Sequence, residues 1–285
     1  MSTTEALSLK HKALLMDRLK RVHTAISEYS FANLYLFRET HQYRVVFGDE
    51  ICIEGTSHDG HRYLMPTVDL RKANLAYLKK LMKGYDYLFP VPEEALSVLD
   101  PAEFIHTFND GDTDYVYMAD KFRTYPGRDL HSKRNLMKQF TTDHEHKGVP
   151  LTRDNMAEAE AVLWQWQSES TQSIEETDFQ PCLEALNMYD ELVLCGGMYY
   201  ADCEPAGFVI GEEISEDTFV LHFAKARTEF KGIYQYIFNN FASILPHQYM
   251  YINLEQDLEK KALREAKSSY KPDLMLRKAR VKLRK

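Results

Sequence analysis

Residues 114–135 read DYVYMADKFRTYPGRDLHSKRN, and this stretch carries the clearest structural signal in the chain. Asp114–Met118 predicts a β-strand, separated from an earlier strand at Phe104–Thr107 by the turn residues 109–112. Pro126-Gly127 predicts a turn, and a helix is expected from about Asp129 to Asp143. One helix face collects residues at i, i+3, i+4 and i+7, namely His131, Arg134, Asn135 and Lys138. The stretch therefore predicts a strand, a turn and a helix with a cationic face.

A cationic helix face beside a turn suits the binding of phosphate or carboxylate, and the guanidinium of Arg134 offers two parallel donors. The alternative is a solvated basic face, the usual fate of such a run. The substrate-binding residues predicted here are Pro126, Gly127, His131, Lys133, Arg134 and Asn135.

A second strand, loop and helix lie further along the chain. Residues 219–226 predict a strand, 227–232 a short loop and 233–245 a helix. The unpaired amides of a helix N-terminus and its dipole favour phosphate or another oxyanion. The predicted cofactor-binding residues are Lys225, Arg227, Thr228 and Gly232. Because Gly232 is the only glycine of the loop, an ordinary helix cap remains the alternative.

A third stretch suits acid–base chemistry. Asn253, Glu255 and Asp257 alternate at the end of a predicted strand, and a helix is expected over Leu258–Ser269. Acyl transfer needs a base for the acceptor's proton and a donor for the oxyanion. Glu255 or Asp257 suits the base and Lys267 or Tyr270 the donor. Asp257 equally suits a helix N-cap near Lys260 or Lys261, so we favour Glu255 as the base. Asn253 joins the substrate-binding set.

The predicted elements follow a similar order twice. Each half contains helices, a meander of three strands, and then further strands and helices, with a seam at Gly148-Val149-Pro150. The prediction is an α/β (α+β) protein of two domains, residues 1–147 and 148–285. Each domain is expected to be a mixed, mainly antiparallel sheet flanked by helices.

The three stretches resemble signatures of a known bacterial family. Residues 114–135, 225–242 (KARTEFKGIYQYIFNNFA) and 251–272 (YINLEQDLEKKALREAKSSYKP) are similar to motifs of the family that includes the C-terminal domain of phosphatidylglycerol lysyltransferases. The resemblance covers nearly the whole chain and implies two tandem GNAT-like (acyl-CoA N-acyltransferase-like) domains. Enzymes that move amino acids from aminoacyl-tRNA to peptidoglycan precursors share that arrangement. The lipid-modifying members carry a long integral-membrane domain that has no counterpart in this sequence.

Composition and charge indicate which partners, metal sites and cellular location to expect for this protein. The chain has a net charge of −8, yet its last residues are basic. This basic tail contains Lys271, Arg277, Lys278, Arg280, Lys282, Arg284 and Lys285. It suits either contact with an anionic partner or simple solvation. The four cysteines lack metal or disulfide spacing, and no run approaches the ~20 apolar residues of a membrane span. A cytoplasmic protein without a metal site is expected.

The leading functional hypothesis is an aminoacyl- or acyltransferase that acts on an unknown amine or hydroxyl acceptor. Its activated donor would be aminoacyl-tRNA or acyl-CoA, and its partners would include tRNA or, peripherally, anionic lipid. The alternative is a non-catalytic module that binds an anionic ligand on the same fold. Loss of the usual glycine pattern at 227–232 slightly favours aminoacyl-tRNA over acyl-CoA.

Overall fold

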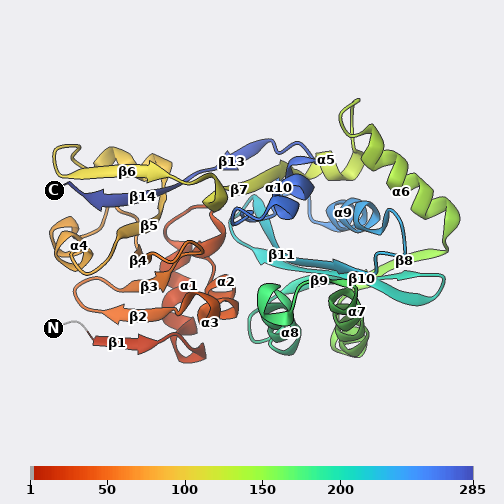
Figure 1. Cartoon of the computed structure of the whole chain (residues 1–285), viewed down its shortest axis with the longest axis horizontal. Coiled ribbons are helices and arrows are strands. Elements are labelled where there is room, and N and C mark those ends of the chain that lie inside the picture. The colour runs from red at the N-terminus through yellow and green to blue at the C-terminus, as the bar shows by residue number, and fades with distance from the viewer. Residues whose placement is uncertain (1–2, 285) are drawn as a thin grey trace. The chain divides into compact units, whose positions relative to one another are not determined.

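The computed structural model describes residues 3–284, which fall into two compact units. Unit 1 comprises Met1–Tyr115, Glu255–Glu265 and Met275–Lys285, and unit 2 comprises Val116–Leu254 and Ala266–Leu274. Each unit is built on its own seven-stranded mixed sheet with helices packed against it (Figure 1). The division falls within the strand β7 (Asp114–Met118).

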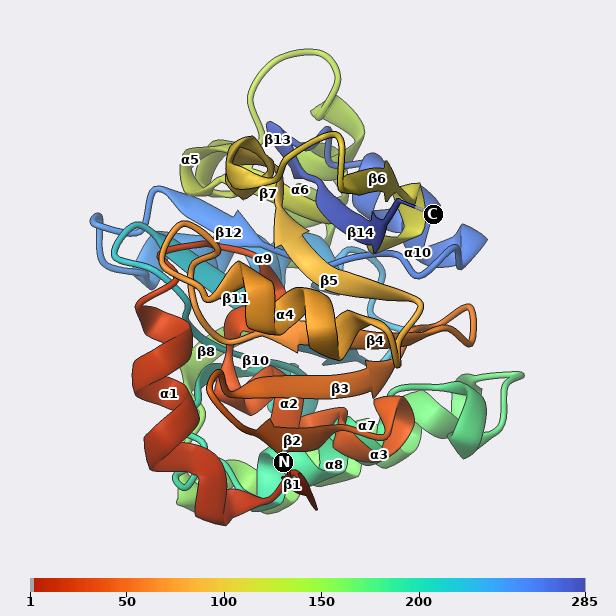
Figure 2. The same ribbon diagram turned by 90° about the vertical axis from the view of Figure 1, so that its left-hand side faces the viewer.

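The sheet of unit 1 has the order β1-β2-β3-β4-β5-β14-β6. Its strands are β1 (Thr3–Ala6), β2 (Arg44–Phe47), β3 (Cys52–Thr56), β4 (Arg62–Pro66), β5 (Tyr87–Pro92), β14 (Lys278–Leu283) and β6 (Phe104–Phe108). Only β4 and β5 pair in parallel, and β14 runs antiparallel to both of its neighbours. Figure 2 shows β14, from the end of the chain, between strands from the first half.

Helices cover the sheet of unit 1. They are α1 (Lys12–Lys20), α2 (Phe31–Leu36), α3 (Arg38–His41) and α4 (Leu75–Met82). The side chain of Asn74 caps α4 by accepting a hydrogen bond from the amide of Tyr77 at 3.1 Å. The apolar face of α4 packs on a core that includes Leu88 and Val281, and this burial fixes β14 in the sheet.

The sheet of unit 2 has the order β13-β7-β12-β11-β10-β9-β8. Besides β7, its strands are β13 (Leu274–Leu276), β12 (Tyr251–Asn253), β11 (Thr218–Ala226), β10 (Glu204–Glu213), β9 (Cys195–Ala201) and β8 (His146–Pro150). Strands β11 and β12 pair in parallel, whereas β8, β9, β10 and β11 form an antiparallel succession.

Helices lie on both faces of this second sheet, as Figure 1 shows. They are α5 (Ala119–Thr124), α6 (His131–Asp143), α7 (Met156–Glu169), α8 (Phe179–Asn187) and α9 (Ile233–Ile244). Helices α5 and α6 both contact α9, while α7 packs on α8 and on the central strands. The short helix α10 (Lys261–Ser268) crosses the boundary between the units.

The main expectations from the sequence are confirmed. The structure contains two mixed, mainly antiparallel sheets with helices, and the predicted cationic helix is α6. The helix expected from Leu258 begins later, at Lys261. No helix within residues 3–284 is long and apolar enough to cross a membrane.

The compact units do not follow the predicted division into residues 1–147 and 148–285. Residues 148–150, interpreted as a seam, form part of β8 and pair with β9. Helix α6 packs on α9 and therefore belongs to unit 2, whereas β14 returns to the sheet of unit 1. Long-range strand pairing decides these memberships, and a pattern of local elements carries no record of it.

Candidate functional site

The turn before α6 is held by the helix itself. Tyr125 and Gly127 have left-handed backbones, with φ of 43° and 73°. The Nη1 of Arg134 donates to the carbonyl oxygen of Tyr125, and lies 3.3 Å from that of Gly127. Arg134 thus positions the Pro126-Gly127 turn. Among the other predicted residues of this segment, the amide of Asn135 lies 3.4 Å from Nδ1 of His131.

Lys133 and Tyr270 come together inside unit 2. The Nζ of Lys133 lies 4.2 Å from the centre of the Tyr270 ring, which is a cation–π contact. Partial burial lowers the pKa of Lys133. Burial raises the pKa of Tyr270, whose hydroxyl therefore stays protonated at neutral pH. That hydroxyl accepts a hydrogen bond from Nε2 of Gln235 at 2.8 Å and keeps its own proton to donate.

Two neighbours of this pair were missed by sequence reasoning. Gln235 links the Tyr270 hydroxyl to Tyr125, whose own hydroxyl donates to the Gln235 carbonyl at 2.8 Å. Tyr125 and Gln235 are both buried. Gln235 is buried in α9 between Ile233 and Tyr236, and a polar residue at such a position was the signal available in the sequence.

The cationic side chains of α6 form no ion pair with any carboxylate in the part of the chain that the structure describes. Within residues 3–284, no carboxylate lies at ion-pair distance from Lys133, Arg134 or Lys138, or from Arg128 in the preceding turn. Lys138 and His131 are exposed, and Lys133 and Arg134 are half-buried. The face formed by Arg128, Lys133, Arg134 and Lys138, here called the α6 basic face, therefore carries uncompensated positive charge.

The predicted cofactor loop is different, because two of its cations, Lys225 and Arg227, are already paired. Lys225 is buried, with its Nζ 2.6 Å from Asp178 Oδ1 and 3.6 Å from the centre of the Trp166 ring. Arg227 forms salt bridges to Glu204, at 2.9 Å, and to Glu229.

The amide and hydroxyl of the next loop residue are also occupied. Thr228 donates from both groups to Oε2 of Glu169, at 3.1 and 2.7 Å. Carboxylates of unit 2 thus fill the positions that a phosphate would take around Lys225, Arg227 and Thr228.

Gly232 is required by packing. It precedes α9 with φ of 93°, and a Cβ at this position would lie 2.1 Å from the carbonyl oxygen of Leu136 in α6. The same added Cβ would lie 3.1 Å from the Cβ of Phe140. The glycine lets the backbones of α6 and α9 approach closely, in agreement with the reading of the loop as a structural cap.

The predicted acids lie in unit 1. Glu255 is 9% exposed, has a left-handed backbone, and accepts a hydrogen bond from Nδ2 of Asn33 at 2.9 Å. Asp257 does not cap α10. Its carboxylate accepts from the Tyr115 hydroxyl at 2.7 Å and from Nε of Arg264 at 2.7 Å.

Asp257 also accepts from the amide of Glu259 at 2.8 Å, so it closes a turn before the helix begins. Burial pushes its pKa upwards, but the hydrogen bonds from Arg264 and Tyr115 outweigh burial and hold the pKa below the ordinary value.

The remaining predicted residues belong to unit 2. Asn253 is fully buried in β12, opposite Val116 of β7 and Val220 of β11. Lys267 is half-buried near the end of α10, and its carbonyl accepts from the Tyr117 hydroxyl at 2.7 Å. The structure therefore places the predicted base, Glu255, and the predicted donors, Lys267 and Tyr270, in different units.

Two residues of the basic tail are neither solvated nor presented to a partner. Lys278 and Arg280 are 1% and 6% exposed, because β14 is a central strand. The Nζ of Lys278 lies 2.5 Å from Glu28 and 2.6 Å from Asp114. Arg280 binds Asp112 through two bonds of 2.6 and 2.9 Å. For these two residues, both sequence interpretations were wrong.

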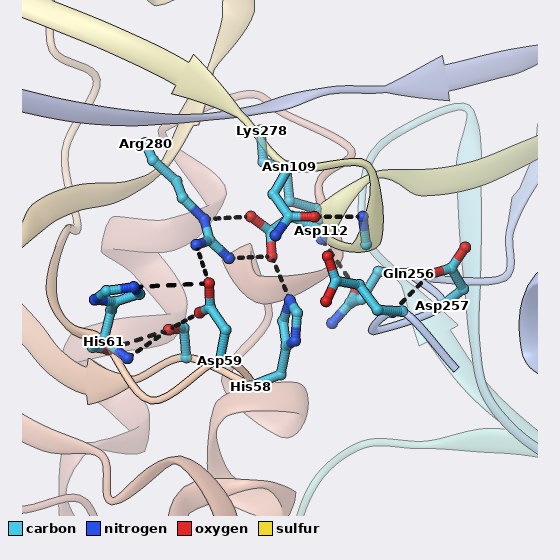
Figure 3. A network of polar contacts seen from close by, with 12 residues as sticks. His58, Asp59, His61, Asn109, Asp112, Gln256, Asp257, Lys278 and Arg280 are labelled. Atoms are coloured by element: carbon cyan, nitrogen blue, oxygen red, sulfur yellow. Dashed lines mark hydrogen bonds and ion pairs between the residues drawn. The ribbon is translucent and has the colours of Figure 1, made fainter. Parts of the chain in front are cut away.

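The same ionic network extends through unit 1 (Figure 3). The Nη1 of Arg280 lies 2.6 Å from Oδ2 of Asp59, and Nε2 of His58 lies 3.2 Å from Oδ1 of Asp112. Burial raises the pKa of Glu28 to about 7, although the charge of Lys278 opposes this shift. The network stabilises the pairing of the last strand with the first half of the chain.

The two sheets with their helices form a tandem GNAT-like fold. Comparison with known proteins supports this fold class. The structure of L-PGS from Bacillus licheniformis superposes with a TM-score of 0.64 at 13% identity, over 95% of this chain and 91% of that one. A structure named FemX matches with a TM-score of 0.54 at 10% identity, over 98% and 95%. At these identities the likeness concerns the fold.

The family follows from the sequence comparison. Residues 19–280 match the model of the family described as "Phosphatidylglycerol lysyltransferase, C-terminal", and the chain belongs to this family. A conserved protein of unknown function from Bacteroides thetaiotaomicron VPI-5482 is similar throughout, with a TM-score of 0.85, 25% identity and full coverage of both chains. The uncharacterized protein MYCGA3080 of Mycoplasmoides gallisepticum is 23% identical over 76% of this chain and 70% of its own length.

Proposed function

We propose that this protein is an aminoacyltransferase that takes its aminoacyl group from aminoacyl-tRNA and passes it to an amine or hydroxyl acceptor. The observation that carries the proposal is the contrast between two cationic segments of unit 2. The α6 basic face has no carboxylate partner within residues 3–284, whereas Lys225 and Arg227 beside the loop before α9 are paired with acids. Uncompensated cations are what a polyanionic backbone binds.

The same contrast argues against acyl-CoA as the donor. A pyrophosphate at the loop before α9 would have to displace Glu169 from Thr228. It would also meet the carboxylates of Glu204 and Glu229 around Arg227. Like charge at this distance disfavours a phosphate ligand. Membership of the lysyltransferase family is consistent with an aminoacyl donor.

The proposed chemistry needs little activation, because an aminoacyl ester is already reactive. The acceptor's nitrogen or oxygen bonds to the ester carbonyl carbon, and the bond from that carbon to the ribose oxygen breaks. Glu255 takes the acceptor's proton and gives it to the ribose oxygen as that oxygen leaves, so the carboxylate is regenerated.

The first test is tRNA binding at several salt concentrations. Lys138→Gln removes one exposed cation of the α6 basic face, and Lys231→Gln removes an exposed cation of the loop before α9 as the matched control. Lys138→Gln should weaken tRNA binding and reduce the slope of log K against log salt by about 0.7–0.9, the value for one phosphate contact. Equal slopes for the two variants would overturn this placement of the RNA.

The second candidate is a binding module without catalysis, and one observation favours it. Glu255 is almost fully buried and already hydrogen-bonded to Asn33, as a structural carboxylate would be. Glu255→Gln separates the two functions. Loss of aminoacyl transfer from charged tRNA with unchanged tRNA binding supports the enzyme. If wild-type protein binds tRNA but never discharges it in the presence of cell-extract acceptors, the module is favoured. Binding to anionic vesicles in place of tRNA would identify the lipid surface as the partner.

A further inference from the structure

A separate cavity opens in unit 1, on the sheet face next to its edge strand. It has a volume of about 300 Å³, which is at the lower end of the range for small-molecule sites. Strand β6 is an edge of the sheet, paired on one side with β14. Val281 and His106 lie directly opposite each other in this pairing and share a face.

The lining is mainly apolar. Leu96, Leu99 and Phe104 line it together with Val281, which also belongs to the buried core of the unit. Ile105 also lines the cavity and remains 40% exposed. An apolar ligand would remove part of this surface from water, at roughly 25 cal/mol per Å².

The only guanidinium in the lining is that of Arg284, and it is fixed in place. Its Nε donates to the carbonyl oxygen of Pro101 at 3.1 Å, and its backbone amide donates to the carbonyl of Glu103 at 2.8 Å. The nearby carboxylate of Glu103 forms an ion pair with Lys79, whose Nζ lies 2.5 Å from Oε1. Within residues 3–284, no carboxylate lies at ion-pair distance from Arg284.

With Nε anchored, the two terminal nitrogens of Arg284 remain to hold one carboxylate in a planar, two-point contact. We infer that this cavity binds a free monocarboxylic acid with an aliphatic chain of medium length, the chain lying on Leu99, Phe104 and Val281 and the carboxylate on Arg284. This site shares no residue with the proposed transferase site or with the α6 basic face, so it is independent of the proposed transferase function.

Calorimetric titration of the full chain with sodium octanoate, below its micellar concentration, tests the inference. Saturable binding is expected, and Arg284→Gln should weaken it about tenfold, as loss of a two-point charged contact does. Lys282→Gln is the matched control, because Lys282 lies two residues before Arg284 and the change removes the same charge from a side chain that does not line the cavity. It should change the affinity less than twofold.

A second variant tests the cavity itself. Leu96→Trp, at a half-buried position of the wall, should fill the space and abolish binding while the thermal unfolding midpoint without ligand stays unchanged. Three results would overturn the inference: no saturable octanoate binding, equal losses for Arg284→Gln and Lys282→Gln, or displacement of octanoate by phosphatidylglycerol vesicles. The last would make the occupant a lipid surface.

Discussion

Replacing Gly232 by alanine should destabilise unit 2 far more than the same change at Gly127. Both glycines have positive φ, 93° and 73°. A non-glycine residue in this region costs about 1–2 kcal/mol at either position. The difference arises in the surroundings: an added Cβ meets nothing within 4 Å at Gly127, but lies 2.1 Å from the Leu136 carbonyl oxygen at Gly232.

The overlap at Gly232 involves backbone atoms of α6, which cannot rotate away as a side chain would. Forcing extra atoms into a packed position costs about 1–3 kcal/mol, so Gly232→Ala should lose about 2–5 kcal/mol in total. Gly127→Ala should lose about 1–2 kcal/mol, from its backbone conformation alone.

Urea unfolding followed by far-UV circular dichroism, with thermal scans as a second measure, gives the comparison. The two variants should differ by at least about 1 kcal/mol at matched m-values. Equal losses would refute the reasoning, because the approach of α6 to α9 at Gly232 would then contribute nothing. A loss of unfolding free energy of this size would also explain the need for glycine at position 232 by helix packing alone, with no role for a bound phosphate.

The ionic network of unit 1 gives two further expectations. Burial raises the pKa of Glu28 to about 7 from an ordinary value of 4.5, so between these pH values the folded state holds a proton that the unfolded state releases. Stability should therefore fall as the pH rises from about 4.5 to 7, and Glu28→Gln should flatten this part of a stability–pH profile; an unchanged slope would contradict the assignment. Arg280→Met leaves the carboxylates of Asp112 and Asp59 without their guanidinium and should cost about 3–5 kcal/mol in urea unfolding. Arg277→Met, at an exposed cation just before the same strand, is the control and should cost less than about 1 kcal/mol.

Local pattern was enough to predict most of the elements. The run Asp114–Met118 predicted β7, and the Pro126-Gly127 turn with its periodic helix predicted α6 within two residues of its observed start. Such signals are strong because side-chain direction repeats every two residues in a strand and about every 3.6 in a helix. The end of the chain was harder to interpret. Lys278 and Arg280 look like members of a solvated tail until their strand is placed between two others.

Sequence pattern predicted only part of the candidate site. The sequence identified Lys133 and Tyr270, and the structure brings their side chains together. It did not identify Gln235 or Tyr125, whose hydrogen bonds link that pair to α9 and to the turn before α6. Side chains from three separate segments meet there, and no spacing along the chain encodes such a meeting.

The sequence by itself determined the tandem GNAT-like fold, the family, and the cationic character of α6, since all of these rest on local periodicity and ordered motifs. Tertiary structure alone decided which cations are available to a ligand. Lys225 and Thr228 are paired with acids 47 and 59 positions away, whereas Lys133 lies over the ring of Tyr270 and has no ion pair within residues 3–284. The net charge of a segment can be summed from its sequence. Whether a given cation is neutralised by an acid depends on distances that only the folded backbone sets.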